Sequence, residues 1–226
     1  LQVAYIGFPG SNGAAFIDYM FTDKTVLPEA HLDTYSEATA YLPHCYLITD
    51  DAQPISDAPI SRKSQNLPDD AIVFCSFNQG FKITPDVFDA WCEIIADTKD
   101  SALWLLEKNP LAKFNLRKEA QTRGIDGDRL IFANQIPKPD HMARTRLADL
   151  ALDTGIYTDH VTTCDMLWAG LPVITRLGRH FASRVSASAL KAAGLPELMT
   201  ESWRAFVALG MQHADDRSLL ASYRNW

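Results

Sequence analysis

The chain has 226 residues, enough for one large domain or about one and a half average ones. Its formal net charge of −7 at pH 7 argues against a general binder of nucleic acids or membrane surfaces. Apolar residues make up 47% of the sequence, which is enough for a sizeable core. No apolar run approaches the length of a membrane span, about eighteen residues. We therefore expect neither a nucleic-acid partner nor a membrane.

Cysteine and metal-ligand patterns give little sign of bound metal. Cys45, Cys75, Cys92 and Cys164 form no CxxC pair, and three of them lie in apolar or helical settings, so reduced thiols and a cytoplasmic location are expected. No cluster of Asp and His has metal-ligand spacing, and we expect no metal and no other cofactor. Both ends of the chain lie within apparent elements, so we interpret them as cuts rather than natural termini.

The first 66 residues have a weak pattern. The apolar run from Val3 to Phe8 predicts a strand, and a glycine-rich turn follows it from Gly7 to Gly13. Residues 14–21, AAFIDYMF, predict a helix, and residues 45–49, CYLIT, predict a further strand. Residues 51–68 carry prolines and little periodicity, so they predict a linker.

From Asp69 onward, strand and helix patterns alternate. Strands are predicted at 71–77, 102–107, 129–133, 150–152 and 171–175. Helices are predicted from Pro85 with Thr84 as N-cap, at 111–123 before Gly124, at 140–148, 160–169 and 180–193, and in two stretches after Ser202. This alternation predicts an α/β fold with a doubly wound parallel sheet.

Residues 150–175 carry the most specific functional signal. Polar residues, among them His160, Thr162 and Asp165, gather at the start of a helix that follows a strand. The N-terminus of such a helix lies at the carboxyl edge of a parallel sheet and suits a phosphate, because its backbone N–H groups are unpaired and its dipole end is positive. Asp165, one turn further, could accept hydrogen bonds from a ribose, so the segment predicts a nucleotide site.

A structural interpretation competes with this one. Thr162 and Asp165 are spaced almost as in a capping box, with Asp in place of the usual Glu. Taken alone, capping and ligand binding are about equally plausible for this pair, and a lone His160 is more often a surface or cap histidine. The choice between capping and ligand binding therefore depends on residues elsewhere in the chain.

Two further polar loops follow predicted strands. Gln79 and Lys82 follow strand 71–77, where a lysine can meet phosphate oxygens, although a lone loop lysine is more often only solvated. After strand 129–133, His141 could stack on a base while backbone at Ile136 reads the base edge; a proline-rich turn is the alternative. Loops at the carboxyl edges of successive strands converge on one crevice, which favours a ligand site.

The chain closely resembles the O-linked N-acetylglucosamine transferase family, which moves GlcNAc from UDP-GlcNAc to Ser or Thr of proteins. The most specific segments are GFPGSNGAAFIDYMFTD, YSEATAYLPH, LPDDAIVFCSFNQGFKITP, LADLALDT and DMLWAGLPVIT. The resemblance implies a GT-B glycosyltransferase with a Rossmann-like C-terminal domain at 67–226 that binds the UDP-sugar. Residues 1–66 would be the tail of the N-terminal catalytic domain and the linker, and the tetratricopeptide array of many members would lie outside this chain.

The same resemblance implies roles for individual residues. Lys82 and His160 would be catalytic, and Lys82 would stabilise negative charge on the departing UDP. The residues implied to bind the UDP-sugar are Gln79, Lys82, Ile136, Pro137, Lys138, His141, Arg144, His160, Val161, Thr162 and Asp165. The sugar pocket would be formed by Gly7, Pro9, Phe81 and Tyr157.

The sequence departs from the family at three points. Val161 stands where relatives usually have threonine, which removes one hydroxyl from the phosphate site, about 1 kcal/mol. Tyr157 is large for a position where relatives can have a small residue. The family's acceptor-side histidines lie in a stretch ahead of this chain, so no general base can be named.

Three functional hypotheses follow. The leading one is an inverting O-GlcNAc transferase with a protein or peptide acceptor. The second is a related protein glucosyltransferase that uses UDP-glucose. The third is a nucleotide-sugar-binding module without transferase activity; Lys82 and His160 argue against it, and Val161 mildly favours it.

Overall fold

The structure, a computed structural model that describes residues 1–224, contains two parallel β-sheets. The smaller sheet has the strand order β1-β2-β3, formed by Val3–Ala4, Tyr19–Thr22 and Ala38–Tyr41. The larger sheet has the order β6-β5-β4-β7-β8-β9. Its strands are β4 (Ile72–Ser76), β5 (Ser101–Leu106), β6 (Leu130–Ala133), β7 (Leu150–Leu152), β8 (Val173–Arg176) and β9 (Met199–Thr200).

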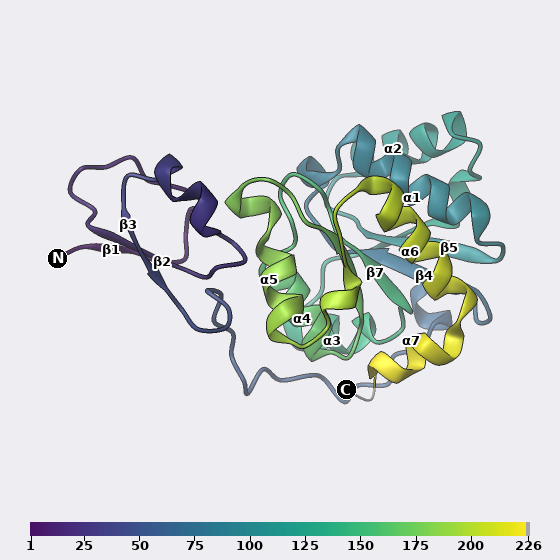
Figure 1. Cartoon of the computed structure of the whole chain (residues 1–226). Helices are drawn as coiled ribbons and strands as arrows, with labels where there is room; N and C mark the ends of the chain where they lie inside the picture. The colour runs from purple at the N-terminus through teal and green to yellow at the C-terminus, as the bar shows by residue number, and fades with distance from the viewer. Residues whose placement is uncertain (225–226) are drawn as a thin grey trace.

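Helices connect the strands of the larger sheet, as the alternating pattern predicted. They are α1 (Pro85–Asp97), α2 (Pro110–Thr122), α3 (Lys138–Thr145), α4 (Val161–Trp168), α5 (Val185–Ala192), α6 (Trp203–Asp215) and α7 (Arg217–Arg224). Strand order reverses between β4 and β7, so the chain is wound in both directions from the centre of the sheet. The predicted α/β fold with a doubly wound parallel sheet is confirmed (Figure 1).

Local signals set the helix starts, with small errors in the prediction. Pro85 occupies the first position of α1 after Thr84, as expected. The side chain of Asn109 caps α2 by accepting from the N–H of Leu111, so this helix begins at Pro110 rather than at 111. Helix α3 spans Lys138–Thr145, not 140–148, since a proline in the first turn is compatible with a helix.

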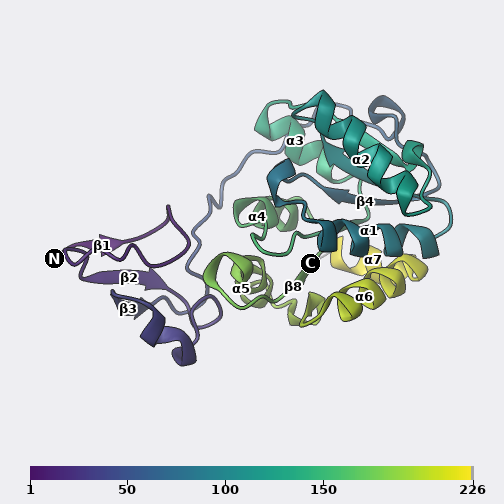
Figure 2. The ribbon, with the colours of Figure 1, turned by 90° about the horizontal axis from the view of Figure 1, so that it is seen from above.

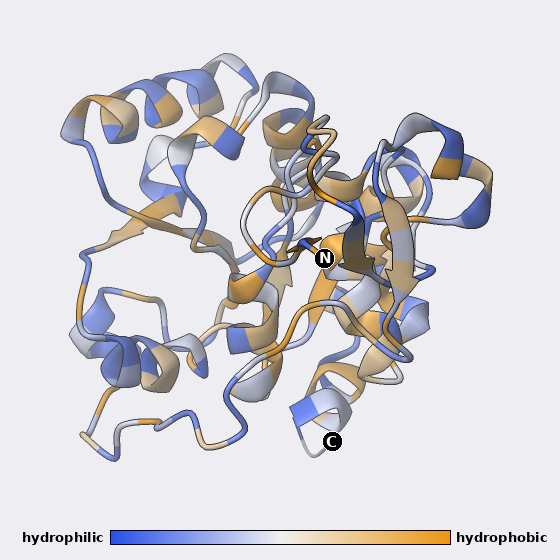
Figure 3. Ribbon diagram, turned by 90° about the vertical axis from the view of Figure 1, so that its left-hand side faces the viewer, coloured by the Kyte–Doolittle hydropathy of each residue, from blue (hydrophilic) through white to orange (hydrophobic). Residues whose placement is uncertain are grey.

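The hydrophobic core lies on both faces of the larger sheet. Alternate residues of β4 point to opposite faces: Phe74 belongs to the cluster that contains α1 and α6, while Val73 packs with Met166 of α4. Helices α1 and α6 lie side by side (Figure 2). Hydrophobic residues gather on the strands and on the inward faces of the helices (Figure 3). This core fixes the carboxyl ends of the central strands.

Three predictions for the N-terminal part were wrong. Residues 14–21 do not form a helix; Tyr19–Thr22 instead alternate between exposed and buried side chains as strand β2. Residues 45–49 form no strand, and residues 38–41 form β3 in their place. The first strand is limited to Val3–Ala4 rather than extending to Phe8.

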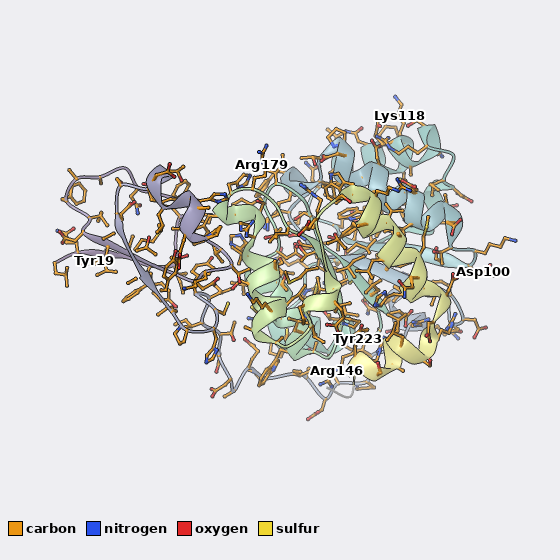
Figure 4. The ribbon with its side chains drawn as sticks, viewed as in Figure 1. Tyr19, Asp100, Lys118, Arg146, Arg179 and Tyr223 are labelled. Atoms are coloured by element: carbon orange, nitrogen blue, oxygen red, sulfur yellow. The ribbon has the colours of Figure 1, made fainter. Side chains whose placement is uncertain are left out.

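The small sheet packs against α5 of the larger unit. Met20, Tyr46 and Leu47 share one buried cluster with Phe181 and Val185. Figure 4 labels Tyr19 on the side of the small sheet that points away from this contact. The predicted linker, residues 51–68, crosses between the units as an extended segment with one short 3-10 turn (Figure 1).

Polar contacts add to this packing. Arg184 Nε, just before α5, donates to the carbonyl oxygen of Thr25 at 2.7 Å, and Ser188 Oγ donates to Asp23 Oδ2 at 2.6 Å. Asp23 is only 2% exposed, so a charge-assisted hydrogen bond fixes the contact between the units. This contact holds the glycine-rich turn beside the larger sheet.

Candidate functional site

A cavity of about 360 Å³ lies between the two units. The larger unit contributes the loop after β4 and the loop between β7 and α4, and the smaller unit contributes the turn after β1. Seven of the sequence-predicted site residues line it: Gly7, Pro9, Phe81, Lys82, Tyr157, His160 and Val161. The cavity is therefore at the carboxyl edge of the sheet, where the strand order reverses.

Helix α4 begins at this cavity. Its N-cap is His160, which has a left-handed φ of 47°, and Val161 at the first helical position is 48% exposed. Thr162 lies inside the helix and its N–H donates to the carbonyl oxygen of Asp159, so the capping-box interpretation of Thr162 and Asp165 is wrong. The first turn of α4 instead directs the positive end of the helix dipole toward the cavity.

Lys82 points into the protein rather than into solvent. Its Nζ donates to the carbonyl oxygen of Thr158 at 2.9 Å and lies 4.7 Å from the centre of the Tyr157 ring. Burial lowers the pKa of Lys82, while the nearby Asp159 and Asp153 act in the opposite direction. The interpretation of Lys82 as a solvated loop lysine is therefore wrong.

His160 is held by two contacts. Its ring stacks on Tyr157 with centroids 4.6 Å apart and planes 19° from parallel, and Nε2 lies 3.2 Å from the carbonyl oxygen of Ala182. Burial lowers the pKa of His160 to about 4, and the ammonium of Lys82 contributes in the same direction. The imidazole is thus neutral at pH 7, so among the described residues that line this cavity Lys82 is the cation.

Asp165, one turn further along α4, forms an ion pair with Lys138 at the start of α3. Lys138 Nζ lies 3.1 Å from Asp165 Oδ1. Both residues line a larger cavity of about 840 Å³, which also includes Gln53 and Ile55 of the linker. Val161 lines both cavities, so the two spaces adjoin at the start of α4.

Arg144 and His141 on α3 form a third group. Arg144 is 1% exposed, and its Nη1 donates to the carbonyl oxygen of Asn134 at 2.6 Å. His141 packs edge-on against Phe77 with centroids 4.8 Å apart. Burial, with the positive charges of Arg144 and Lys138, lowers the pKa of His141 to about 4.

The remaining predicted residues lie around these groups. Gln79 is exposed at the start of the short 3-10 turn Gly80–Lys82, and Ile136 and Pro137 directly precede α3. Among the described residues, neither cavity is lined by Gln79, Ile136, Pro137, His141, Arg144 or Thr162.

Sequence reasoning missed a buried polar group beneath the first cavity. Asp159 lines the cavity and its carboxylate accepts from the amide of Asn78, while Asp153 lies fully buried directly after β7. The available signal was the position of Asp153 at the carboxyl end of a predicted strand. Asp159, next to His160, could have been noted for the same reason.

The described residues offer neither a metal-ligand cluster nor a membrane-spanning helix. Within residues 1–224, no three His, Cys, Asp or Glu side chains form a group that could hold a metal ion. No helix in this part of the chain is long and apolar enough to cross a membrane.

A doubly wound sheet with this site at its reversal point is the arrangement found in GT-B glycosyltransferases. The chain belongs to glycosyl transferase family 41, whose model matches residues 1–58 and 54–226. A sucrose-phosphate synthase of Thermosynechococcus elongatus shares the fold alone, with a TM-score of 0.52 and 16% identity over 91% of this chain and 56% of that one.

Similar proteins in the family are known from plants, animals and bacteria. The chain is 40% identical to a probable UDP-N-acetylglucosamine–peptide N-acetylglucosaminyltransferase SEC of Arabidopsis thaliana, over 86% of this chain and 20% of that protein. It is 27% identical to the corresponding Caenorhabditis elegans enzyme, over 99% of this chain and 29% of that protein. A mutant O-GlcNAc transferase of Thermobaculum terrenum superposes with a TM-score of 0.88 at 27% identity, covering 100% of this chain and 42% of that one.

The chain therefore spans between a fifth and a third of the length of these two curated relatives.

Proposed function

We propose that this chain contributes the donor site of an inverting glycosyltransferase that moves GlcNAc from UDP-GlcNAc to Ser or Thr hydroxyls of proteins. The observation that carries the proposal is the cavity in which Lys82 and the start of α4 face Gly7 and Pro9 from the other unit. The names of the similar proteins supply the donor and the acceptor class.

Charge stabilisation is the proposed contribution to catalysis. When the glycosidic bond breaks, negative charge develops on the β-phosphate of the departing UDP. Lys82 and the N–H groups at the start of α4 are fixed beforehand, so they can stabilise this charge without reorganisation. His160, whose single ring proton on Nε2 is donated to the carbonyl oxygen of Ala182, would cover the sugar-phosphate end, and Gln79 and Thr162 would add contacts to the diphosphate.

The nucleoside would extend along α4 toward α3. The Lys138–Asp165 pair, in the adjoining cavity, would hold the ribose. His141 would stack on uracil, and Arg144 with the backbone at Ile136 and Pro137 would frame the base edge. Burial of Arg144 and its hydrogen bond to Asn134 support a preformed wall for the base.

The sugar would occupy the first cavity, between the two units. Phe81 is 77% exposed at its rim, and Tyr157 lines its wall. We assign both residues to the N-acetyl group and the Gly7–Pro9 turn to the opposite face of the sugar.

We assign residues 1–66 to the end of the N-terminal catalytic domain with its linker, and 67–226 to the UDP-sugar-binding domain. The two separate sheets support this division. The four cysteines are free thiols, which fits the reducing cytoplasm. We propose a protein acceptor, and neither a nucleic-acid nor a membrane partner and no metal in the transfer step.

Calorimetry with UDP tests the site in the full-length protein. Asp165→Ala removes the proposed ribose contact and should weaken UDP binding about tenfold, as expected for a hydrogen bond to a charged group. Asp128→Ala is the control, since Asp128 is an exposed aspartate at the far side of the sheet. Equal affinity in wild type and Asp165→Ala would remove Asp165 from the site.

Donor competition tests the reaction. With a peptide acceptor, UDP-GlcNAc should be used in preference to UDP-glucose. A preference for UDP-glucose would favour the related glucosyltransferase, and UDP binding without any transfer would favour a binding module.

A further inference from the structure

Lys82 is held at the donor cavity by uncharged groups. Its ammonium donates to the carbonyl oxygen of Thr158 at 2.9 Å and lies over the Tyr157 ring, 4.7 Å from the ring centre. Within residues 1–224, no carboxylate is close enough to Lys82 to form an ion pair. An ion pair would cancel much of the positive charge, whereas a carbonyl oxygen and a ring face hold the ammonium and leave its charge available.

The Tyr157 ring is fixed by contacts within its own loop. The imidazole of His160 stacks on it with centroids 4.6 Å apart, and Nε2 of this histidine donates to the carbonyl oxygen of Ala182. The hydroxyl of Thr154 donates to the carbonyl oxygen of Tyr157 at 2.6 Å. The Tyr157 side chain is half-buried, so these contacts keep its ring beside Lys82.

The carbonyl group that accepts from Lys82 is fixed in the same way. Thr158 is fully buried, and its N–H and Oγ1 both donate to the carbonyl oxygen of Ala182, at 3.0 and 2.9 Å. Ala182 belongs to the short 3-10 helix Phe181–Ser183 that precedes α5. One backbone oxygen therefore anchors both Thr158 and His160, and the groups around the ammonium form a single rigid unit.

These contacts leave part of the ammonium free. An ammonium has three N–H donors, so one hydrogen bond and one ring face leave at least one donor for a ligand. Lys82 and Tyr157 both line the donor cavity, which makes this donor available there. A lysine has a long flexible stem, and its orientation before the reaction is what makes a fixed charge effective in the transition state.

We propose that Tyr157 is a positioning residue for the transfer step. The face of its ring, together with the carbonyl oxygen of Thr158, keeps the Lys82 ammonium oriented at the donor cavity without cancelling its charge. Tyr157 therefore acts on the departing diphosphate through Lys82, in addition to lining the sugar pocket. The proposal rests on the proposed function of Lys82 at the diphosphate.

Substitution of Tyr157 separates its ring from its hydroxyl. The contact with Lys82 uses the ring, so Tyr157→Phe should keep kcat close to the wild-type value. Tyr157→Leu keeps an apolar side chain but has no π face, and kcat should fall about tenfold. Tyr19→Leu is the matched control and should leave kcat unchanged, because Tyr19 lies on the small sheet, away from the cavity (Figure 4).

A double-mutant cycle shows whether Tyr157 acts through Lys82. Lys82→Met alone should lower kcat about a hundredfold. The double variant Lys82→Met/Tyr157→Leu should be no slower than Lys82→Met, since no ammonium is left to position. Losses that multiply to about a thousandfold would overturn the proposal and leave Tyr157 as a wall of the sugar pocket.

NMR of the protein labelled with carbon-13 at lysine Cε tests the contact without donor or acceptor. Protons over the face of an aromatic ring are shifted upfield, so the ε protons of Lys82 should resonate apart from those of exposed lysines such as Lys118. Lys82→Met assigns the signal. Tyr157→Phe and the control Tyr19→Leu should keep the shift, and Tyr157→Leu should abolish it. An unshifted Lys82 signal in wild type, or a shift that persists in Tyr157→Leu, would contradict the proposal.

A second variant covers the case in which Tyr157→Leu does not fold. Tyr157→Met then takes its place, because a flexible thioether fills irregular space and also lacks a ring face. If neither variant folds, the wild-type spectrum still shows whether the ring lies over the Lys82 ammonium.

The outcomes separate this proposal from the proposed function. Absence of UDP binding in wild type would overturn the proposed function, while the Lys82 signal would still decide whether the ring holds the ammonium. If Tyr157→Leu changed only the KM for the donor and the preference between UDP-GlcNAc and UDP-glucose, the positioning role would be wrong. Tyr157 would then contact the N-acetyl group alone.

Discussion

Arg144 donates through Nε to Nδ1 of His141 at 2.9 Å. Because Nδ1 is the acceptor, the single ring proton of the neutral imidazole is on Nε2. A second proton on His141 would break this hydrogen bond and place two positive charges side by side in a buried site. The contact therefore fixes both the tautomer and the charge of the proposed base-stacking residue.

Burial of His141, together with the adjacent charge of Arg144, makes stability depend on pH. The pKa of His141 is about 4 in the folded chain, below its ordinary value near 6.5, so the unfolded chain binds the extra proton first. The contribution of neutral His141 to the stability of the fold is fully present above about pH 6.5 and is lost as the pH drops toward 4. His141→Gln should reduce the slope of unfolding free energy against pH by up to about 1.4 kcal/mol per pH unit between pH 6 and 5.

Urea unfolding at several pH values measures this slope. His44→Gln, at an exposed histidine, is the matched control. An unchanged slope in His141→Gln would mean that His141 is not held neutral.

Replacement of Lys82 tests its catalytic function. Lys82→Met keeps most of the aliphatic stem and removes the charge at the donor cavity, so kcat should fall on the order of a hundredfold or more. Lys118→Met is the control, because Lys118 is exposed on α2, far from the cavity (Figure 4). Steady-state kinetics would contradict the catalytic role if only KM changed.

Val161 can be tested with a substitution that should strengthen UDP binding. Its side chain is 48% exposed and lines both cavities, so a hydroxyl there would not be placed in the core. Val161→Thr should tighten UDP binding by up to ~1 kcal/mol, about fivefold. Val161→Ala, which removes bulk without adding a hydroxyl, should show no gain. Calorimetry on the three proteins decides, and equal gains would assign the effect to side-chain size.

Gly210 on α6 tests the packing behind the site. A Cβ at this position would lie 2.7 Å from Cδ1 of Ile94 on α1. Alanine usually stabilises a helix relative to glycine, but here overpacking should lower stability by about 1–3 kcal/mol. Ile94→Val removes the clashing methyl and should restore part of the loss in the double variant. Thermal unfolding measures both, and a stabilised Gly210→Ala would contradict the close packing.

The sequence was most informative where local chemistry decides the structure. The larger sheet follows from apolar runs separated by capped helices, since signals such as Thr84-Pro85 and Gly170 act within a few residues. The apolar side chains of residues 14–21 suit both the 3.6-residue period of a helix and the two-residue period of a strand. Packing of β2 between β1 and β3 selected a strand, and this choice depends on contacts distant in sequence.

The candidate site was likewise predictable only where local sequence determines the structure. Loops that follow strands could be placed at one edge of the sheet, and Lys82, His160 and Val161 do meet at one cavity. The burial of Asp153 and Asp159 could not be predicted, because it depends on the path of the loop between them. Burial of Lys82 against Thr158 also required the fold.

The contact between Arg184 and Thr25 has a consequence for proteolysis. The small sheet shares its buried residues with Phe181 and Val185 instead of enclosing a separate core. A protease that cuts the extended segment at residues 51–60 would therefore break the chain without separating its parts. The two fragments should remain associated as a non-covalent complex and unfold together in a single transition.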